Sequence, residues 1–160
     1  MNNYCYHFKL AGEDFYIMSW KQSSSEKPFR LQVAELRSMR RTEDSVALLT
    51  HEKIKPLDCF AAYIHALDSF KMGRNRSRVI DLETLLHLYG ESQISLLQRE
   101  IERRVAEKGF YHVCIMYRGE HPGPLSLPIP PSSLTCSSIS MSEQDYQSLT
   151  SIVGNHLRLS

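Results

Sequence analysis

The sequence lacks long apolar runs and closely spaced cysteines. Its most apolar stretch, residues 110–117, is interrupted by His112 and is much shorter than the roughly 20 apolar residues of a membrane-spanning helix. The opening residues MNNYCYHFKL have neither the basic nor the long apolar region of a secretory signal. The four cysteines lie far apart, whereas zinc sites and redox motifs usually place two ligands close together. We therefore expect a cytoplasmic chain with no metal site and no disulfides.

An excess of charge of one sign is absent as well. Nineteen basic and eighteen acidic residues give a formal charge of +1 in a chain of 160 residues. The chain as a whole therefore does not attract nucleic acid, and any RNA site must come from a local cluster of cations. The composition, 42% apolar and 23% charged, is typical of a globular protein, and the length fits one domain.

The common catalytic and nucleotide-binding motifs are also missing. The sequence contains no G-x-G-x-x-G, no P-loop, no H-E-x-x-H and no G-x-S-x-G. Seven histidines are scattered without a pair at i, i+4 spacing. Glu100 and Arg104, like Arg103 and Glu107, stand four residues apart, which is typical of a solvated helix face. The residues therefore favour a protein that is not an enzyme and holds no cofactor.

The patterning that is present predicts strands on both sides of a central group of helices. Tyr4, Tyr6, Phe8 and Leu10 alternate with other residues, as in a half-buried strand. Further strands are predicted at residues 15–20, 46–50 and 110–118, and helices at 29–39, 56–73, 81–89, 92–109 and 142–157. A proline- and serine-rich connection spans residues 119–140. We expect one α+β domain of residues 1–160, with a mostly antiparallel or mixed sheet packed with a central cluster of helices.

Two local features stand out from this background. Residues 71–78, KMGRNRSR, carry four positive charges and no acid between two predicted helices. They are either a solvated loop or a strip that contacts successive phosphates. The helix at 81–89, for which Asp81 is a candidate N-cap, carries Leu82, Leu85, Leu86 and Tyr89 between two other amphipathic helices. These side chains either belong to the core or, because the helix is crowded between its neighbours, leave some apolar surface for a partner.

These two segments together resemble a known family. The basic run 71–78, the sequence LETLLHLYGESQI at 82–94 and the alanine-containing helix around residues 60–66 are similar to the central motif of the kinase-binding subunit of the KEOPS complex. This family includes the PRPK-binding protein, and the similarity is to its archaeal type. His87 departs from the pattern, because archaeal relatives often have arginine there, and the region after Gly119 has no match.

The resemblance implies a non-catalytic subunit of a tRNA-modifying complex. KEOPS installs threonylcarbamoyladenosine at position 37 of tRNA, and this subunit binds the small atypical kinase of the complex and recruits tRNA through its single-stranded 3′ CCA end. The expected tRNA-binding residues are Lys71, Arg74, Arg76, Arg78, His87 and Gln93, and the expected kinase-binding residues are Leu82, Leu85, Leu149, Ile152 and Val153. Two alternatives stay open: an adaptor that binds a kinase without touching RNA, and an enzyme of unrecognised type.

Overall fold

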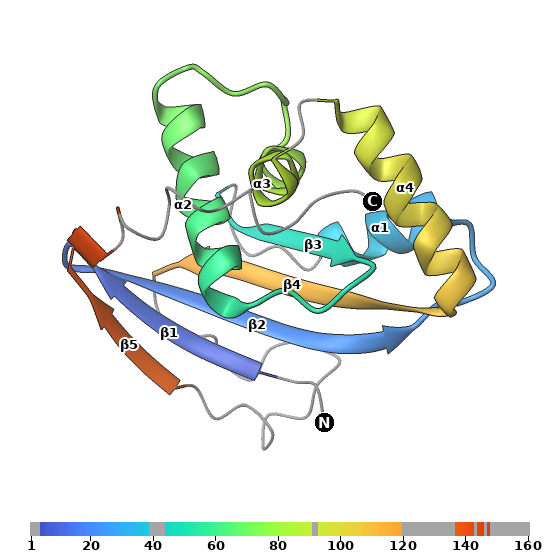
Figure 1. Cartoon of the computed structure of the whole chain (residues 1–160), viewed down its shortest axis with the longest axis horizontal. Coiled ribbons are helices and arrows are strands. Elements are labelled where there is room, and N and C mark those ends of the chain that lie inside the picture. The colour runs from blue at the N-terminus through green and yellow to red at the C-terminus, as the bar shows by residue number, and fades with distance from the viewer. Residues whose placement is uncertain are drawn as a thin grey trace.

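The computed structural model describes residues 4–38, 44–90, 93–119, 137–142, 144, 145 and 147. Their elements run in the order β1 (Tyr4–Leu10), β2 (Glu13–Ser23), α1 (Phe29–Arg37), β3 (Val46–Thr50), α2 (Pro56–Lys71), α3 (Ile80–Tyr89), α4 (Ile94–Lys108), β4 (Phe110–Arg118) and β5 (Ser137–Met141). Helices α2, α3 and α4 lie on the same side of one curved sheet (Figure 1). This is the α+β class that the sequence predicts.

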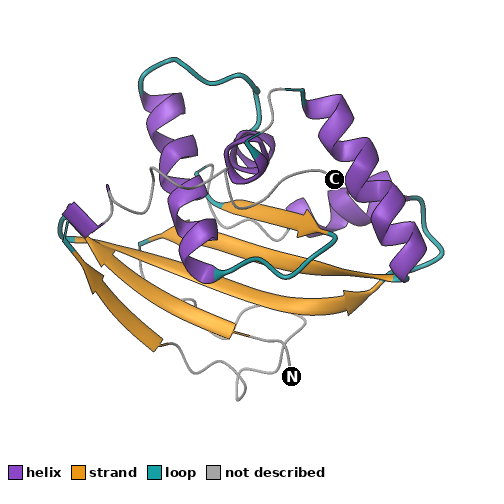
Figure 2. Cartoon of the chain, viewed as in Figure 1, coloured by secondary structure: helices purple, strands orange, loops and turns teal. Residues whose placement is uncertain are grey.

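The sheet is mixed, with the strand order β3-β4-β2-β1-β5. The β1–β2, β2–β4 and β3–β4 pairs are antiparallel, whereas β5 lies parallel to β1 (Figure 2). The 11-residue strand β2 forms the middle of the sheet and pairs with β4 from Phe15↔Arg118 to Ser23↔Phe110. Because of this register, the C-terminal end of β4 lies at the same end of the sheet as the turn between β1 and β2. Arg118 is thereby placed near elements that are distant in sequence.

Helix α2 anchors the helical layer on the sheet through aromatic and sulfur contacts. The Phe60 ring stacks on Phe8 with 4.4 Å between centroids and meets Phe15 edge-on at 5.4 Å. The Cys59 and Cys114 sulfurs lie 3.5 Å apart, and both thiols are free and buried. The alanine-containing stretch of this helix is buried, because small side chains let the helix lie close to the strands.

The helix ends agree in part with the sequence expectations. Pro56 begins α2, and Gly90 and Gly109 end α3 and α4 with φ values of 64° and 77°, which glycine adopts at low cost. Asp81 does not cap α3, because the helix begins one residue earlier and has no side-chain cap. Its Oδ1 instead accepts the Ala47 N–H at 2.8 Å. The carboxylate therefore satisfies a backbone donor of edge strand β3, a role that local sequence cannot reveal.

The last described residues carry the predicted start of a C-terminal helix. Ser142 Oγ accepts the Asp145 N–H at 3.1 Å, and the Asp145 carboxylate accepts the Ser142 N–H at 3.3 Å. This reciprocal pair is the geometry of a capping box and confirms Ser142 as an N-cap. The rest of the predicted helix lies outside the described residues, as does most of the proline- and serine-rich connection.

Two further expectations concern cysteine and the membrane. Cys5 in β1 is disulfide-bonded, so the expectation that the chain has no disulfide is wrong for this residue. Wide spacing along the sequence does not exclude a disulfide, because folding brings distant residues together. In the part of the chain that is described, every helix is too short or too polar to cross a membrane.

Candidate nucleic-acid interface

The basic strip, residues 71–78, is the connection between α2 and α3, at the end of the helical layer that lies away from the sheet (Figure 1). Lys71, Arg74, Arg76 and Arg78 are all exposed. The strip nevertheless has a defined backbone. The Arg74 N–H donates to Ser69 O at 2.8 Å, and the Gly73 N–H donates to Phe70 O at 3.3 Å, with φ of 67° at Gly73. These bonds satisfy carbonyls at the end of α2 and fix the direction in which the strip leaves it.

The strip is held by a buried carboxylate. Glu83 of α3 is fully buried, and its Oε2 accepts the N–H groups of Arg76 at 2.8 Å and Ser77 at 2.9 Å. Its Oε1 lies 3.7 Å from Arg76 Nε and 3.3 Å from His87 Nε2. One acid under the strip therefore binds both the backbone and one guanidinium. Glu83 lies within the run 82–94 that carries the resemblance, but its role depends on how the strip folds back over α3 and was not expected from the sequence.

His87 lies beneath the strip and contacts protein groups. Its Nε2 is 3.1 Å from Ser69 Oγ of α2, and its ring stacks on that of His65 with 5.4 Å between centroids. Burial lowers the pKa of His87, the nearby Arg76 lowers it further, and Glu83 opposes both effects. The ring thus links α2 to α3 under the strip, and its side chain stays 23% exposed.

A hollow of about 510 Å³ lies beside the strip; we call it the α2–α3 hollow. Among the residues that the structure describes, Lys71, Arg78 and Arg118 line it together with one acid, Asp44, and these four carry a formal surplus of two positive charges. Its apolar lining comes from the end of α2 and the start of α3, namely Leu67, Phe70, Val79 and Ile80. The structure thus brings two of the four predicted cations to one concave surface, and Arg74 and Arg76 are not among its lining residues.

Arg118 is the site residue that sequence reasoning missed. It is 40 positions after Arg78, and no local motif marks it. Its Nε donates to Asp44 Oδ2 at 2.6 Å, and this hydrogen bond is the main reason that the pKa of Arg118 is raised. The Tyr63 hydroxyl donates to the backbone oxygen of Asp44 at 2.5 Å. Asp44 and Arg118 therefore form a fixed pair at the rim of the hollow, and both side chains remain partly exposed.

The remaining predicted residues lie elsewhere. Gln93 immediately precedes α4 and does not line the α2–α3 hollow. Leu85 is 7% exposed and belongs to the core, whereas Leu82 is half-buried. The structure buries the other large apolar side chains of α3, so the apolar surface expected on this helix is limited to Leu82. Leu149, Ile152 and Val153 lie outside the described residues.

Apolar surface is present instead between α1 and α4. A hollow of about 420 Å³ there, the α1–α4 hollow, is lined by Phe29, Val33 and polar neighbours. A smaller space that shares Phe29 and Val33 continues toward Leu82 and Leu85. Leu31 of α1 is 47% exposed. Met72 of the basic strip and Leu96 of α4 are exposed as well, so the exposed apolar side chains are spread over several elements, and the sequence analysis considered none of these three for a partner contact.

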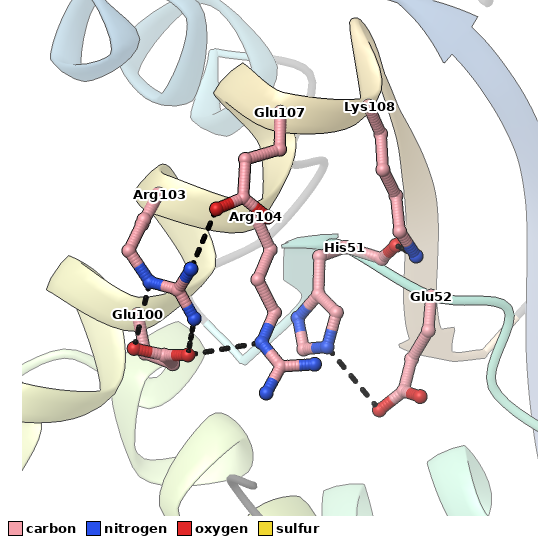
Figure 3. Close-up of polar contacts among 7 residues, drawn as sticks. All are labelled: His51, Glu52, Glu100, Arg103, Arg104, Glu107 and Lys108. Carbon is pink, nitrogen blue, oxygen red and sulfur yellow. Dashed lines mark hydrogen bonds and ion pairs between the residues drawn. The ribbon is translucent and has the colours of Figure 1, made fainter.

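A polar cluster on α4 and the end of β3 is shown in Figure 3. Arg103 binds both Glu100 and Glu107, and Arg104 Nε donates to Glu100 at 3.0 Å. This confirms the solvated helix face that the spacing predicts. Next to it, the His51 side chain is buried, and burial together with Arg104 and Lys108 lowers its pKa to about 4. His51 is therefore a neutral structural ring at pH 7. Among the described residues, no group of His, Cys, Asp and Glu could hold a metal ion.

Known proteins give no further guidance. Comparison with models of known protein families found no match, and comparison with curated protein sequences found none either.

Proposed function

We propose that this chain is a non-catalytic subunit of a KEOPS-type complex. In this role it binds the small atypical kinase of the complex and recruits tRNA through its 3′ CCA end, for threonylcarbamoyladenosine formation at position 37. The proposal comes from the sequence resemblance, and one structural observation supports it. The basic strip is held on a buried acid beside a cationic hollow with an apolar lining.

This arrangement suits a single-stranded RNA end. Such an end offers phosphates that Lys and Arg can bind, and unstacked bases that pack on aromatic or apolar surfaces. Lys71 and Arg78 line the α2–α3 hollow together with Phe70, so charge and ring occur on the same surface. A hollow of about 510 Å³ is in the range of ordinary small-ligand sites, which fits one nucleotide.

The decisive experiment measures binding of this protein to intact tRNA and to tRNA without its CCA end, at several salt concentrations. If the four cations of the strip all contact phosphate, the logarithm of the affinity should fall with the logarithm of salt with a slope of roughly −3. If only Lys71 and Arg78 do, the slope should be roughly −1.4. Loss of binding with the CCA end supports the proposal. Equal or absent binding of both tRNAs contradicts it.

A matched pair of variants separates a local site from general attraction. Lys71→Ala/Arg78→Ala removes two cations from the α2–α3 hollow. Lys53→Ala/Arg99→Ala removes two exposed cations elsewhere and changes the net charge equally. We expect the first pair to lose at least about 10-fold in affinity and the second pair to bind like the wild type. Equal losses in both would indicate unspecific attraction.

The second candidate function is a protein adaptor that does not bind RNA, and the α1–α4 hollow favours it. Apolar Phe29 and Val33 line that hollow, and exposed Leu31 lies on the same helix. If tRNA does not bind but the isolated atypical kinase does, and Val33→Asp abolishes the kinase contact, the adaptor is the better account. If both bind, the two functions share one molecule.

The proposed role places the protein in the cytoplasm, where the glutathione pool keeps most thiols reduced. Cys5 would then carry a free thiol in the cell, whereas it is disulfide-bonded in the structure. Mass spectrometry of the alkylated protein, purified with and without reductant, separates the two states. A bond that persists in protein alkylated directly in cells would contradict the cytoplasmic assignment.

A further inference from the structure

A serine, a histidine and an aspartate from three strands are joined by hydrogen bonds. His7 of β1 lies between Asp14 of β2 and Ser138 of β5. Its Nε2 is 2.6 Å from Asp14 Oδ1, and its Nδ1 is 3.3 Å from Ser138 Oγ. Phe8 stacks on Phe60 of α2, so its neighbour His7 points to the opposite face of the sheet. None of the three residues lines the α2–α3 hollow, so this cluster is separate from the basic strip.

The hydrogen bonds determine which ring nitrogen of His7 can act as a base. A carboxylate accepts hydrogen bonds and does not donate them, so Nε2 is the donor in the bond to Asp14. In the neutral imidazole Nδ1 then carries the lone pair, and this nitrogen is the one next to the Ser138 hydroxyl. The Tyr16 ring stacks on His7 with 4.7 Å between centroids and 11° between planes, which limits rotation of the imidazole.

We propose that Ser138, His7 and Asp14 form a nucleophilic site that hydrolyses small carboxylic esters. This activity goes beyond the proposed function, does not depend on it and takes no part in tRNA modification. A serine hydroxyl is a weak nucleophile unless an adjacent base takes its proton and a third group orients that base. All three groups are present here. Ser138 is exposed, so an ester can reach its Oγ.

The reaction has two steps. In the first, Ser138 Oγ attacks the carbonyl carbon of the ester while its proton passes to His7 Nδ1; the C–O bond to the alcohol then breaks, and the alcohol leaves with that proton. In the second, water attacks the acyl-serine and gives a proton to Nδ1. The bond between the acyl carbon and Oγ then breaks, the carboxylic acid leaves, and Ser138 regains its proton. Asp14 keeps its charge throughout and is a positioning residue, because it holds the Nε2–H and stabilises the imidazolium.

The surroundings of the site indicate which substrates it suits. β5 is the outermost of the strands that the structure describes, and the outer edge of such a strand presents backbone N–H groups. Lys9 is exposed and lies two residues from His7 on the same face of β1. These donors can stabilise the oxyanion that forms on the ester. The side chains of His7 and Asp14 are 23% and 43% exposed, so the site is shallow and suits small acyl groups.

The test is covalent labelling of the full chain with a fluorophosphonate, a probe of activated serines. Ser138 Oγ attacks the phosphorus, fluoride leaves, and the proton passes to His7. Ser140 is the internal control, because it is exposed and lies two residues along the same strand. Mass spectrometry of the peptide that contains both serines locates the label. We expect the wild type to be labelled at least about 10-fold faster at Ser138 than at Ser140, and His7→Gln to lose this excess.

Asp14→Asn separates positioning of the ring from a structural role. An amide can donate to Nε2, so the ring proton can move to Nδ1, which removes the base next to Ser138. The rate of labelling at saturating probe should therefore fall, while the probe concentration that gives half of this rate stays the same. Nitrogen NMR of the His7 ring should show the proton on Nε2 in the wild type and on Nδ1 in the variant. Glu26→Gln, at an exposed acid outside the cluster, should change none of these quantities.

Three results would overturn the inference. Equal labelling of Ser138 and Ser140 in the wild type, or labelling of neither, means that Ser138 is not activated. Labelling of Ser138 that persists in His7→Gln means that another group activates it. An unchanged labelling rate in Asp14→Asn means that Asp14 does not position the ring. The wild-type pattern decides the matter even if a variant does not fold, and none of these results bears on RNA binding, so the proposed function is tested separately.

Discussion

The buried acid beneath the basic strip provides the sharpest stability prediction. Glu83 is fully buried and accepts two backbone N–H bonds, from Arg76 and Ser77. Glu83→Ala removes Oε2, the acceptor of both bonds, and leaves the buried Ser77 N–H without this partner. Glu83→Gln keeps one oxygen in the same place, so the amide can accept the same donors without the charge. The two variants thus separate the loss of the hydrogen bonds from the loss of the charge.

The expected magnitude follows from these two bonds. Hydrogen bonds to a charged acceptor contribute about 1.5–3 kcal/mol each, whereas the ion pair with Arg76 adds little, because that guanidinium is exposed. We therefore expect Glu83→Ala to lower the free energy of unfolding by about 3–4 kcal/mol and Glu83→Gln by about 1–2 kcal/mol. In a domain of this size, a loss of 1 kcal/mol in the free energy of unfolding lowers the melting temperature by about 2–4 °C. The melting temperature of Glu83→Ala should therefore fall by roughly 10 °C.

Two measurements check the reasoning. Thermal and urea unfolding measure the change in the free energy of unfolding of the whole domain. Glu107→Ala is the matched control, because the Glu107 carboxylate is exposed and ion-paired only at the surface. Hydrogen exchange gives the local one, since the Arg76 and Ser77 amides should lose protection in Glu83→Ala and keep most of it in Glu83→Gln. If Glu83→Ala unfolds like the wild type, or these two amides stay protected in it, Glu83 does not hold the strip.

Three further predictions concern other buried groups. Asp81→Ala removes the acceptor of the Ala47 N–H and an ion pair to α1. Urea unfolding should therefore show that the free energy of unfolding falls by about 3 kcal/mol. A fall of less than about 1 kcal/mol would contradict the assigned role. Burial lowers the pKa of His51 to about 4, below its unfolded value of about 6.5. Its contribution to stability is therefore full above pH 6.5 and is lost as the pH falls toward 4. The unfolding free energy of His51→Leu should change less over this range than that of the wild type, and equal pH profiles would contradict this. The Cys59 and Cys114 thiols are buried, and the hydrogen bond from Cys114 together with burial raises the pKa of Cys59. Both should react with a disulfide reagent only in denaturant, and rapid reaction of either in the native protein would contradict the packing.

Most of the fold was predictable because its elements carry strong local signals. The alternation in residues 4–10, the proline at the start of α2 and the glycines after α3 and α4 each determine backbone geometry within a few residues. The strand order was not predictable, because it depends on which apolar faces meet across the whole chain. The parallel pairing of β5 with β1 joins segments more than 130 positions apart, and no local pattern encodes it.

The site was predictable only where its residues are consecutive. The strip 71–78 is visible as a run of cations, but the hollow beside it also needs Asp44 and Arg118, which the β2–β4 register and the β3–β4 pairing bring to α2. His87 illustrates the opposite case. The resemblance suggests an RNA contact, whereas its ring lies between Ser69, His65 and Glu83. Sequence spacing identifies which residues are polar and close along the chain, but not which way they face.

Three of the four cations of the strip therefore divide into two kinds. Arg76 lies against Glu83, and its charge is opposed there by a buried acid, whereas Lys71 and Arg78 face a hollow with apolar walls. The bonds to Glu83 stabilise the backbone of the strip in either role, as a solvated loop or as a phosphate contact. A strip that binds a flexible RNA end gains further, because a backbone ordered before binding reduces the entropy that binding must overcome.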